Sequence, residues 1–144
     1  MIRIPVALHE AICRAAEQTY PDESCGLLAG RKVDGDTLVT RVVPSPNVAT
    51  GDHRDSFEVD PQVRFDLMRE LEASDQDEQI VGHFHSHPNH PAEPSERDLA
   101  MAYEPDLVWI IASVTDGRTE ELRAHQPAPD ASHFTEIPLH ITDG

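Results

Sequence analysis

The sequence has 144 residues, a length typical of one domain with its own hydrophobic core. Its 11 basic and 27 acidic residues give a formal net charge of −16, which disfavours binding to nucleic acid or to an anionic membrane surface because both need a basic patch. Cys13 and Cys25 have no paired spacing, and no apolar run approaches transmembrane length, so we expect a soluble, cytoplasmic, single-domain protein spanning residues 1–144 without a disulfide framework.

The first third of the chain predicts a helix followed by a hairpin. Apolar residues recur at helical spacing over residues 6–20, and Pro21 ends the pattern. Residues 24–30 (SCGLLAG) have the composition of a buried strand. The Asp34-Gly35 pair after them is a hairpin signal, and residues 38–43 (LVTRVV) form the returning strand.

The middle of the chain predicts a second helix between two strands. A loop follows the hairpin, and then a short strand is expected around residues 57–59. Asp60-Pro61 is a good N-cap and first-position pair for a helix whose apolar residues share one face. After an acidic turn, residues 80–86 predict a central strand.

A short helix and further strands complete the chain. The helix begins at Ser95, and Asp98 lies three residues further on. Residues 107–114 (LVWIIASV) are the most apolar strand, and residues 119–125 and 134–139 predict two more. The order of elements indicates one α/β (α+β) domain with helices flanking a curved mixed sheet. No glycine-rich phosphate loop is present, which disfavours nucleotide binding.

The stretch HFHSHPNHPAEPSERD, residues 83–98, is the strongest candidate for a metal site. Alternate side chains of a strand share a face, so His85 and His87 would project together as a ligand pair. Asp98 could fold back from the next helix as a third ligand. Two histidines and one aspartate with an open fourth position are typical of catalytic zinc. The alternative is a polar histidine-rich loop, because the pattern His-x-His by itself is common.

The other histidines carry no metal pattern. We expect His83, which lies further inside the strand, to be packed and hydrogen-bonded, and His90 to lie in a loop. The remaining five are expected at the surface or in packing roles: His9, His53, His125, His133 and His140.

Two segments together resemble the JAMM metallopeptidase family, also called MPN-plus or Mov34/PAD-1. The first is HSHP at residues 85–88, followed by Ser95-x-x-Asp98 at the family's spacing. The second is Glu23 in the stretch ESCGLLAG, residues 23–30. The resemblance implies a single MPN/JAMM-like domain with a layering like that of cytidine deaminases, in a small prokaryotic member.

The resemblance also implies a role for each motif residue. His85, His87 and Asp98 would bind Zn²⁺. Glu23 would accept a proton from the zinc-bound water and later deliver it to the leaving amine. Ser95 would donate a hydrogen bond to the oxyanion, although its position equally fits a plain helix N-cap.

Two neighbours of these motif residues are interpreted as structural. Ser86 should point to the opposite face of the strand and support it. Cys25 is interpreted as a small buried residue and not as a nucleophile, since no basic partner lies near it in sequence.

The implied reaction is hydrolysis of the amide bond after the C-terminal Gly-Gly of a ubiquitin-like or sulfur-carrier protein. The near-minimal length of the chain favours a prokaryotic substrate of this kind over polyubiquitin. Alternatives are a catalytically inactive MPN scaffold and a metal-binding interaction module. A zinc deaminase is disfavoured because neither H-x-E nor P-C-x-x-C occurs. The sequence leaves the oligomeric state open.

Overall fold

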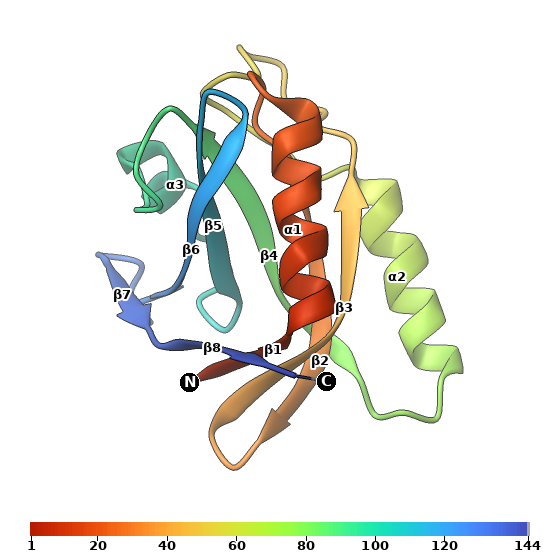
Figure 1. Cartoon of the computed structure of the whole chain (residues 1–144). Helices are drawn as coiled ribbons and strands as arrows, with labels where there is room; N and C mark the ends of the chain where they lie inside the picture. The colour runs from red at the N-terminus through yellow and green to blue at the C-terminus, as the bar shows by residue number, and fades with distance from the viewer. Residues whose placement is uncertain (144) are drawn as a thin grey trace.

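A mixed β-sheet of eight strands runs through the part of the chain that the computed structural model describes, residues 1–143 (Figure 1). The sheet order is β7-β6-β5-β4-β2-β3-β1-β8. The elements are β1 (Ile2–Pro5), α1 (Val6–Thr19), β2 (Cys25–Val33), β3 (Asp36–Ser45), α2 (Pro61–Ala73), β4 (Gln79–Pro88), α3 (Glu96–Ala100), β5 (Val108–Thr115), β6 (Arg118–Pro127), β7 (Phe134–Ile137) and β8 (Leu139–Thr142).

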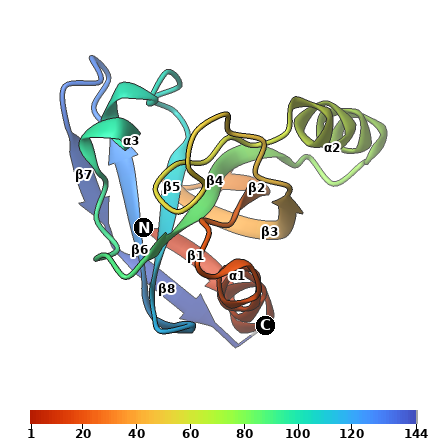
Figure 2. The ribbon, with the colours of Figure 1, turned by 90° about the horizontal axis from the view of Figure 1, so that it is seen from above.

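The sheet curls around α1. β7 and β8 are consecutive in the chain, yet they lie at opposite ends of the sheet order, so the connection at Pro138 joins the two edges (Figure 2). Ile12 and Ala16 of α1 are buried inside the curve with Leu28 and Phe84. This confirms the predicted class, a curved mixed sheet with few helices.

The central strand β2 faces two separate apolar clusters. Leu28 packs toward α1, whereas its neighbours Leu27 and Ala29 pack with Leu67 and Leu71 of α2. Successive side chains of a strand point to opposite faces, so α1 and α2 cover opposite sides of the same sheet. The face that carries α2 also carries the functional site.

The hairpin turn predicted at Asp34-Gly35 is confirmed, and a second turn, at Asp116-Gly117, has the same backbone conformation. Asp34 and Gly35 both have positive φ, 51° and 85°, and so do Asp116 and Gly117, 50° and 83°. Two successive positive φ values are the requirement of a type I′ turn. The predicted cap of α2 is confirmed as well, because the Asp60 side chain accepts a hydrogen bond from the Gln62 amide and Pro61 follows it.

Two sequence predictions need correction, and one strand was missed. The strand predicted around residues 57–59 is only an isolated bridge between Val59 and Asn47. The single strand predicted over residues 134–139 is two strands, because Pro138 interrupts it where the chain crosses between sheet edges. β1 was not predicted, since four residues that pair in parallel with distant strands leave little periodic signal.

Among the described residues, no helix has the length and apolarity needed to span a bilayer.

Candidate metal centre and catalytic site

β4 carries the two motif histidines at the centre of the sheet. It pairs antiparallel with β2 and parallel with β5, and His85 lies in register with Cys25 on one side and Ile111 on the other. Phe84 points to the α1 side of the sheet and is fully buried in that core. His85 and His87 therefore share the opposite face, as the alternation predicts.

Ser86 has the structural role expected of it. Its Oγ accepts a hydrogen bond from the Ser24 amide at 2.8 Å and lies 3.1 Å from the Ser24 hydroxyl. The Ser86 amide in turn donates to the Ser24 carbonyl at 3.1 Å. These bonds fix the start of β2, and so the position of Glu23 beside it, against the end of β4.

The short helix α3 presents Asp98 through a capping box. The Ser95 hydroxyl accepts a hydrogen bond from the Asp98 amide at 3.1 Å, and Asp98 Oδ2 accepts one from the Ser95 amide at 2.9 Å. Both halves of the box hold the Asp98 carboxylate in one orientation, facing β4.

Three potential ligand atoms converge at this point. His85 Nε2 and His87 Nε2 are 3.0 Å apart, and they lie 3.3 Å and 3.2 Å from Asp98 Oδ2. Donor atoms about 2.0–2.1 Å from a tetrahedral zinc ion are about 3.3 Å from one another, so the triangle fits that ion. All three residues are buried, and two imidazoles with one carboxylate match the donors that zinc prefers.

The surroundings of the histidines orient both rings. His87 Nδ1 lies 2.9 Å from the Pro91 carbonyl, to which it can only donate, and this leaves Nε2 with a lone pair for a metal. The His85 ring stacks on Phe57, with centroids 4.2 Å apart and planes at 15°. His85 Nδ1 is buried without a hydrogen-bond partner.

The electrostatics favour a cation between these groups. Burial lowers the pKa of His85. Burial alone would also lower the pKa of His87, but hydrogen bonds to Asp98 and to the Pro91 carbonyl raise it. Burial opposes ionisation of Asp98, yet the two imidazoles hold the pKa of that carboxyl well below its usual range. The carboxylate thus stays charged and available to a cation.

Glu23 lies two residues before the start of β2, and its side chain is buried. One of its oxygens, Oε1, is buried without a hydrogen-bond partner, and burial raises the pKa of this carboxyl to about 8. A carboxylate oxygen of Glu23 and a ring nitrogen of each histidine lie within 4.8 Å of one another, so two metal-binding triples are conceivable. The ligand atoms of the triple with Asp98 lie closer together, at 3.0–3.3 Å, so we assign His85, His87 and Asp98 as the candidate ligands and place Glu23 beside them.

Asn47 holds Glu23 in place, and sequence reasoning missed it. Its Nδ2 donates to the Glu23 carbonyl at 3.2 Å and to the Ser56 carbonyl at 2.9 Å. Its Oδ1 accepts from the amides of Ala49 and Glu58, each at 3.1 Å. One amide side chain thereby ties the loop between β3 and α2 to the residue that carries the carboxyl group. An asparagine in a loop gives no motif by which it could have been found.

A cleft of about 350 Å³ opens beside the centre. Its walls come from the segment before β2, the end of β4 and the proline-rich connector to α3. The lining residues are Glu23, Asp55, His87, His90, Pro91, Glu93, Pro94 and Ser95. The cleft thus brings together the predicted base, one predicted metal ligand and the predicted oxyanion donor.

The remaining histidines behave largely as expected. His83 is packed, with its ring centroid 4.2 Å from that of Trp109, but the predicted hydrogen bond is wrong for its Nδ1, which is buried without a partner. His90 is an exposed loop residue. His125 is buried, and its Nε2 lies 2.9 Å from the Ala92 carbonyl, a packing role. Cys25 is buried as predicted.

Known proteins resemble the chain over most of its length. The family model described as prokaryotic homologs of the JAB domain matches residues 5–126. The CysO-cysteine peptidase of Mycobacterium tuberculosis (strain ATCC 25618 / H37Rv) is 31% identical over 136 residues, 94% of this chain and 88% of that protein. The desampylase of Haloferax volcanii is 37% identical over 122 residues, 84% of this chain and 79% of that protein.

Solved structures share the fold. The solution structure of a Desulfitobacterium hafniense protein matches with a TM-score of 0.85 at 28% identity, covering 100% of this chain and 94% of that one. A structure described as JAMM, a metalloprotease-like zinc site in the proteasome and signalosome, matches with a TM-score of 0.60 at 19% identity, covering 99% and 98%. At that identity the second likeness concerns the fold alone.

Proposed function

The chain belongs to the prokaryotic JAB-domain family and is a hydrolase of the JAMM type, and from this premise we propose that it is a zinc-dependent peptidase or isopeptidase. Its substrate would be the amide bond after the C-terminal Gly-Gly of a ubiquitin-like or sulfur-carrier protein. The observation that carries the proposal is the convergence of His85, His87 and Asp98 within 3.0–3.3 Å beside the buried Glu23 carboxyl group.

In this proposal His85, His87 and Asp98 hold the zinc ion. A zinc ion in such a site polarises the scissile carbonyl and lowers the pKa of water. The hydrogen bond from His87 Nδ1 to the Pro91 carbonyl and the stacking of Phe57 on His85 keep both rings aimed at the same point. The capping box does the same for Asp98.

Glu23 accepts the proton of the attacking water and passes it to the leaving amine nitrogen. Without a metal, burial raises the pKa of the Glu23 carboxyl group to about 8, and a zinc ion beside it would lower that pKa again, so that the carboxylate form can accept a proton near neutral pH. Its unpaired Oε1 has no competing hydrogen bond to break before it takes the proton. His85, His87 and Asp98 already form the tighter triple of ligands, so a buried Glu23 carboxyl group beside them favours a catalytic role over a module that only binds metal.

Ser95 donates a hydrogen bond from its hydroxyl group to the oxyanion of the tetrahedral intermediate. A serine hydroxyl has one donor and two acceptor positions. The capping box uses an acceptor position, because the Asp98 amide donates to Ser95 Oγ. The donor therefore stays available, and the capping and catalytic roles do not compete.

The substrate class follows from the names of two relatives, a CysO-cysteine peptidase and a desampylase. Both names support a small protein modifier or carrier as the substrate on the acyl side. An inactive scaffold of the same fold is disfavoured, because Glu23, His85, His87, Ser95 and Asp98 are all present and close together.

The test is cleavage of a sulfur-carrier protein extended by a fluorescent peptide after Gly-Gly. Wild type loaded with zinc should release the peptide, and Glu23→Gln should lower kcat by a factor of about 10²–10⁴, the usual contribution of a general base. The matched control is Glu72→Gln, which removes one carboxyl group from α2 and should keep wild-type activity. Equal rates for wild type and Glu23→Gln would refute the role of Glu23.

A further inference from the structure

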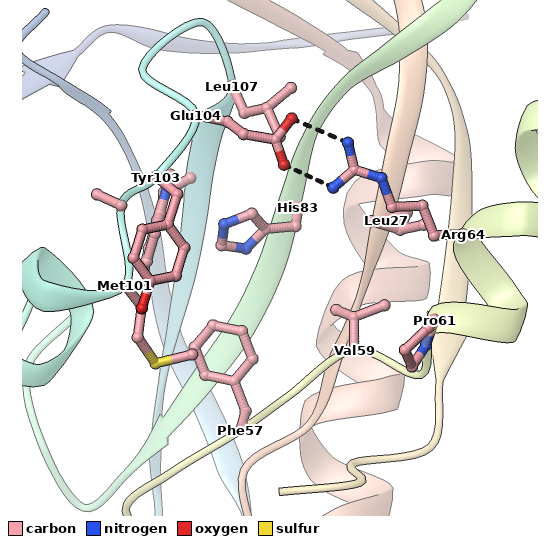
Figure 3. Close-up of a pocket in the computed structure, with 12 residues that line it drawn as sticks. Leu27, Phe57, Val59, Pro61, Arg64, His83, Met101, Tyr103, Glu104 and Leu107 are labelled. Atoms are coloured by element: carbon pink, nitrogen blue, oxygen red, sulfur yellow. Dashed lines mark hydrogen bonds and ion pairs between the residues drawn. The ribbon is translucent and has the colours of Figure 1, made fainter.

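We propose that a second pocket, next to the metal centre, selects the substrate residue that immediately precedes Gly-Gly, and that it accepts an uncharged apolar side chain there. The proposal rests on the function proposed above. Figure 3 shows this pocket. The pocket has a volume of about 280 Å³ and no lining residue in common with the cleft that holds Glu23 and Ser95. It is lined by Leu27, Phe57, Val59, Pro61, Arg64, His83, Met101, Ala102, Tyr103, Glu104, Leu107 and Trp109.

The pocket adjoins the metal centre through a shared wall. The Phe57 ring lines the pocket and also stacks on His85 at 4.2 Å. The pocket's polar wall, His83, lies on the same face of β4 as His85 and two residues before it, with its ring turned into the pocket (Figure 3). Two residues of a strand span about 7 Å.

The direction of the bound tail follows from the chemistry. Glu23 must reach the leaving nitrogen, so the leaving group occupies the cleft that Glu23 lines together with Ser95 and His87. The acyl part of the substrate then extends away from that cleft, toward Phe57 and His83.

The spacing identifies the residue that enters the pocket. In an extended tail, the first and third residues before the scissile bond point their side chains the same way, about 7 Å apart. The first two are the glycines. The third is the residue before them, and it reaches the pocket when the second glycine lies at the metal centre.

The lining determines which side chains fit. Most of the wall is apolar, from Leu27, Phe57, Met101 and Trp109. His83 Nδ1 is buried there without any hydrogen-bond partner. The pocket therefore has no free charge for a charged side chain to pair with, and burying an unpaired charge is costly.

The two charged residues at the pocket neutralise each other. Arg64 Nη1 and Nη2 donate to Glu104 Oε1 and Oε2 at 2.7 Å and 2.9 Å, a bidentate pair between α2 and the loop after α3 (Figure 3). While this pair is intact, neither charge is available to a substrate. Removing one partner would leave the other free to attract a side chain of opposite charge.

The first experiment uses four carrier proteins that differ only in the residue before Gly-Gly: leucine, alanine, glutamate or arginine. Zinc-loaded wild type should cleave the leucine carrier with a kcat/KM at least about tenfold above the glutamate and arginine carriers, with alanine between them. Cleavage of all four at equal rates would overturn the pocket assignment and leave the proposed function standing. Cleavage of none would overturn both.

The second experiment tests whether breaking the Arg64–Glu104 pair changes which charged residue is accepted before Gly-Gly. Glu104→Gln frees Arg64, so the rate for the glutamate carrier relative to leucine should rise at least about fivefold. Arg64→Met frees Glu104 and should raise the relative rate for the arginine carrier by a similar factor. The control is Glu72→Gln, which lies on α2 like Arg64 but does not line the pocket. It should cleave the four carriers in the same order of rates as wild type. An unchanged ranking in Glu104→Gln would overturn the proposal even if Arg64→Met fails to fold.

Discussion

The Nε2 atoms of His85 and His87 face each other at 3.0 Å, and Asp98 Oδ2 lies within 3.3 Å of both. Two imidazole lone pairs at this separation repel each other unless a cation or a shared proton lies between them. Stacking on Phe57 orients the His85 ring, and the hydrogen bond to the Pro91 carbonyl orients the His87 ring. These contacts aim both rings at one point, so binding of a metal to the folded state should stabilise the fold.

Zinc should raise the stability of wild type. At a free zinc concentration one hundred times the Kd, binding to the folded state contributes about 2.7 kcal/mol. His85→Ala should lose this gain, and the exposed His133→Ala should keep it. Thermal unfolding with zinc and with a chelator measures the difference. The same zinc shift in His85→Ala as in wild type would contradict the ligand assignment.

The metal-free protein should gain stability when Glu23 becomes glutamine, increasingly so with rising pH. Burial raises the pKa of Glu23 from 4.5 to about 8, so between these values the folded state binds more protons than the unfolded state. Stability contributed by this group is present below pH 4.5 and is lost as pH rises through 8.

Glu23→Gln removes this dependence on pH. Its advantage over wild type should be small at pH 5 and reach about 2 kcal/mol at pH 8, part of the full linkage because water and neighbouring groups relax around a buried charge. Urea unfolding of the metal-free proteins at pH 5 and pH 8 measures it, with Glu72→Gln as control. A variant less stable than wild type at pH 8 would show that the carboxyl group is not buried as described.

Asn47 should affect catalysis through Glu23. Its Nδ2 bonds to the Glu23 carbonyl at 3.2 Å, so Asn47→Ala should lower kcat about tenfold or more with little change in KM, by displacing the proton acceptor. In a Glu23→Gln background the same substitution should have almost no further effect on kcat. Gln126→Ala, which removes another amide that donates to a backbone carbonyl, is the matched control. Additive losses in the double variant would mean that Asn47 acts independently of Glu23.

Thiol reagents should leave the enzyme active. Burial raises the pKa of the Cys25 thiol to about 12, and a thiol that stays protonated is a poor nucleophile. Incubation with iodoacetamide at pH 8 followed by mass spectrometry should find native Cys25 unmodified, and cleavage should continue at the untreated rate. Inactivation that parallels labelling of Cys25 would contradict the metal-dependent mechanism.

Local sequence signals predicted much of this structure. The helices, the hairpin turn at Asp34-Gly35 and the two histidines on one face of β4 follow from periodicity, one Asp-Gly pair and strand alternation. Asp98 was expected near the histidines because the loop before its helix can fold back, whereas only the resemblance to a known motif indicated that the distant Glu23 lies at the same strand end. The strand predicted over residues 134–139 continued past Pro138 because Ile137 and Leu139 are both apolar, and it included only the first residue of β8.

Features made by distant segments could not be predicted. β1 pairs with β3 and β8, and nothing in its four residues indicates either partner. The hydrogen bonds of Asn47 go to residues on both sides of a loop. The apolar pocket joins four stretches of the chain, at residues 27, 57–64, 83 and 101–109. Such contacts depend on how the sheet curls, which no local pattern encodes.

The most direct test of the central claim is a zinc titration of metal-free protein with two readouts, bound zinc and cleavage after Gly-Gly. For wild type, both signals should rise together and saturate at one equivalent of zinc, whereas Asp98→Asn should bind zinc at least about tenfold more weakly and should cleave in proportion to the zinc it holds. Cleavage by chelator-treated wild type at the rate of the zinc-loaded enzyme would contradict the account.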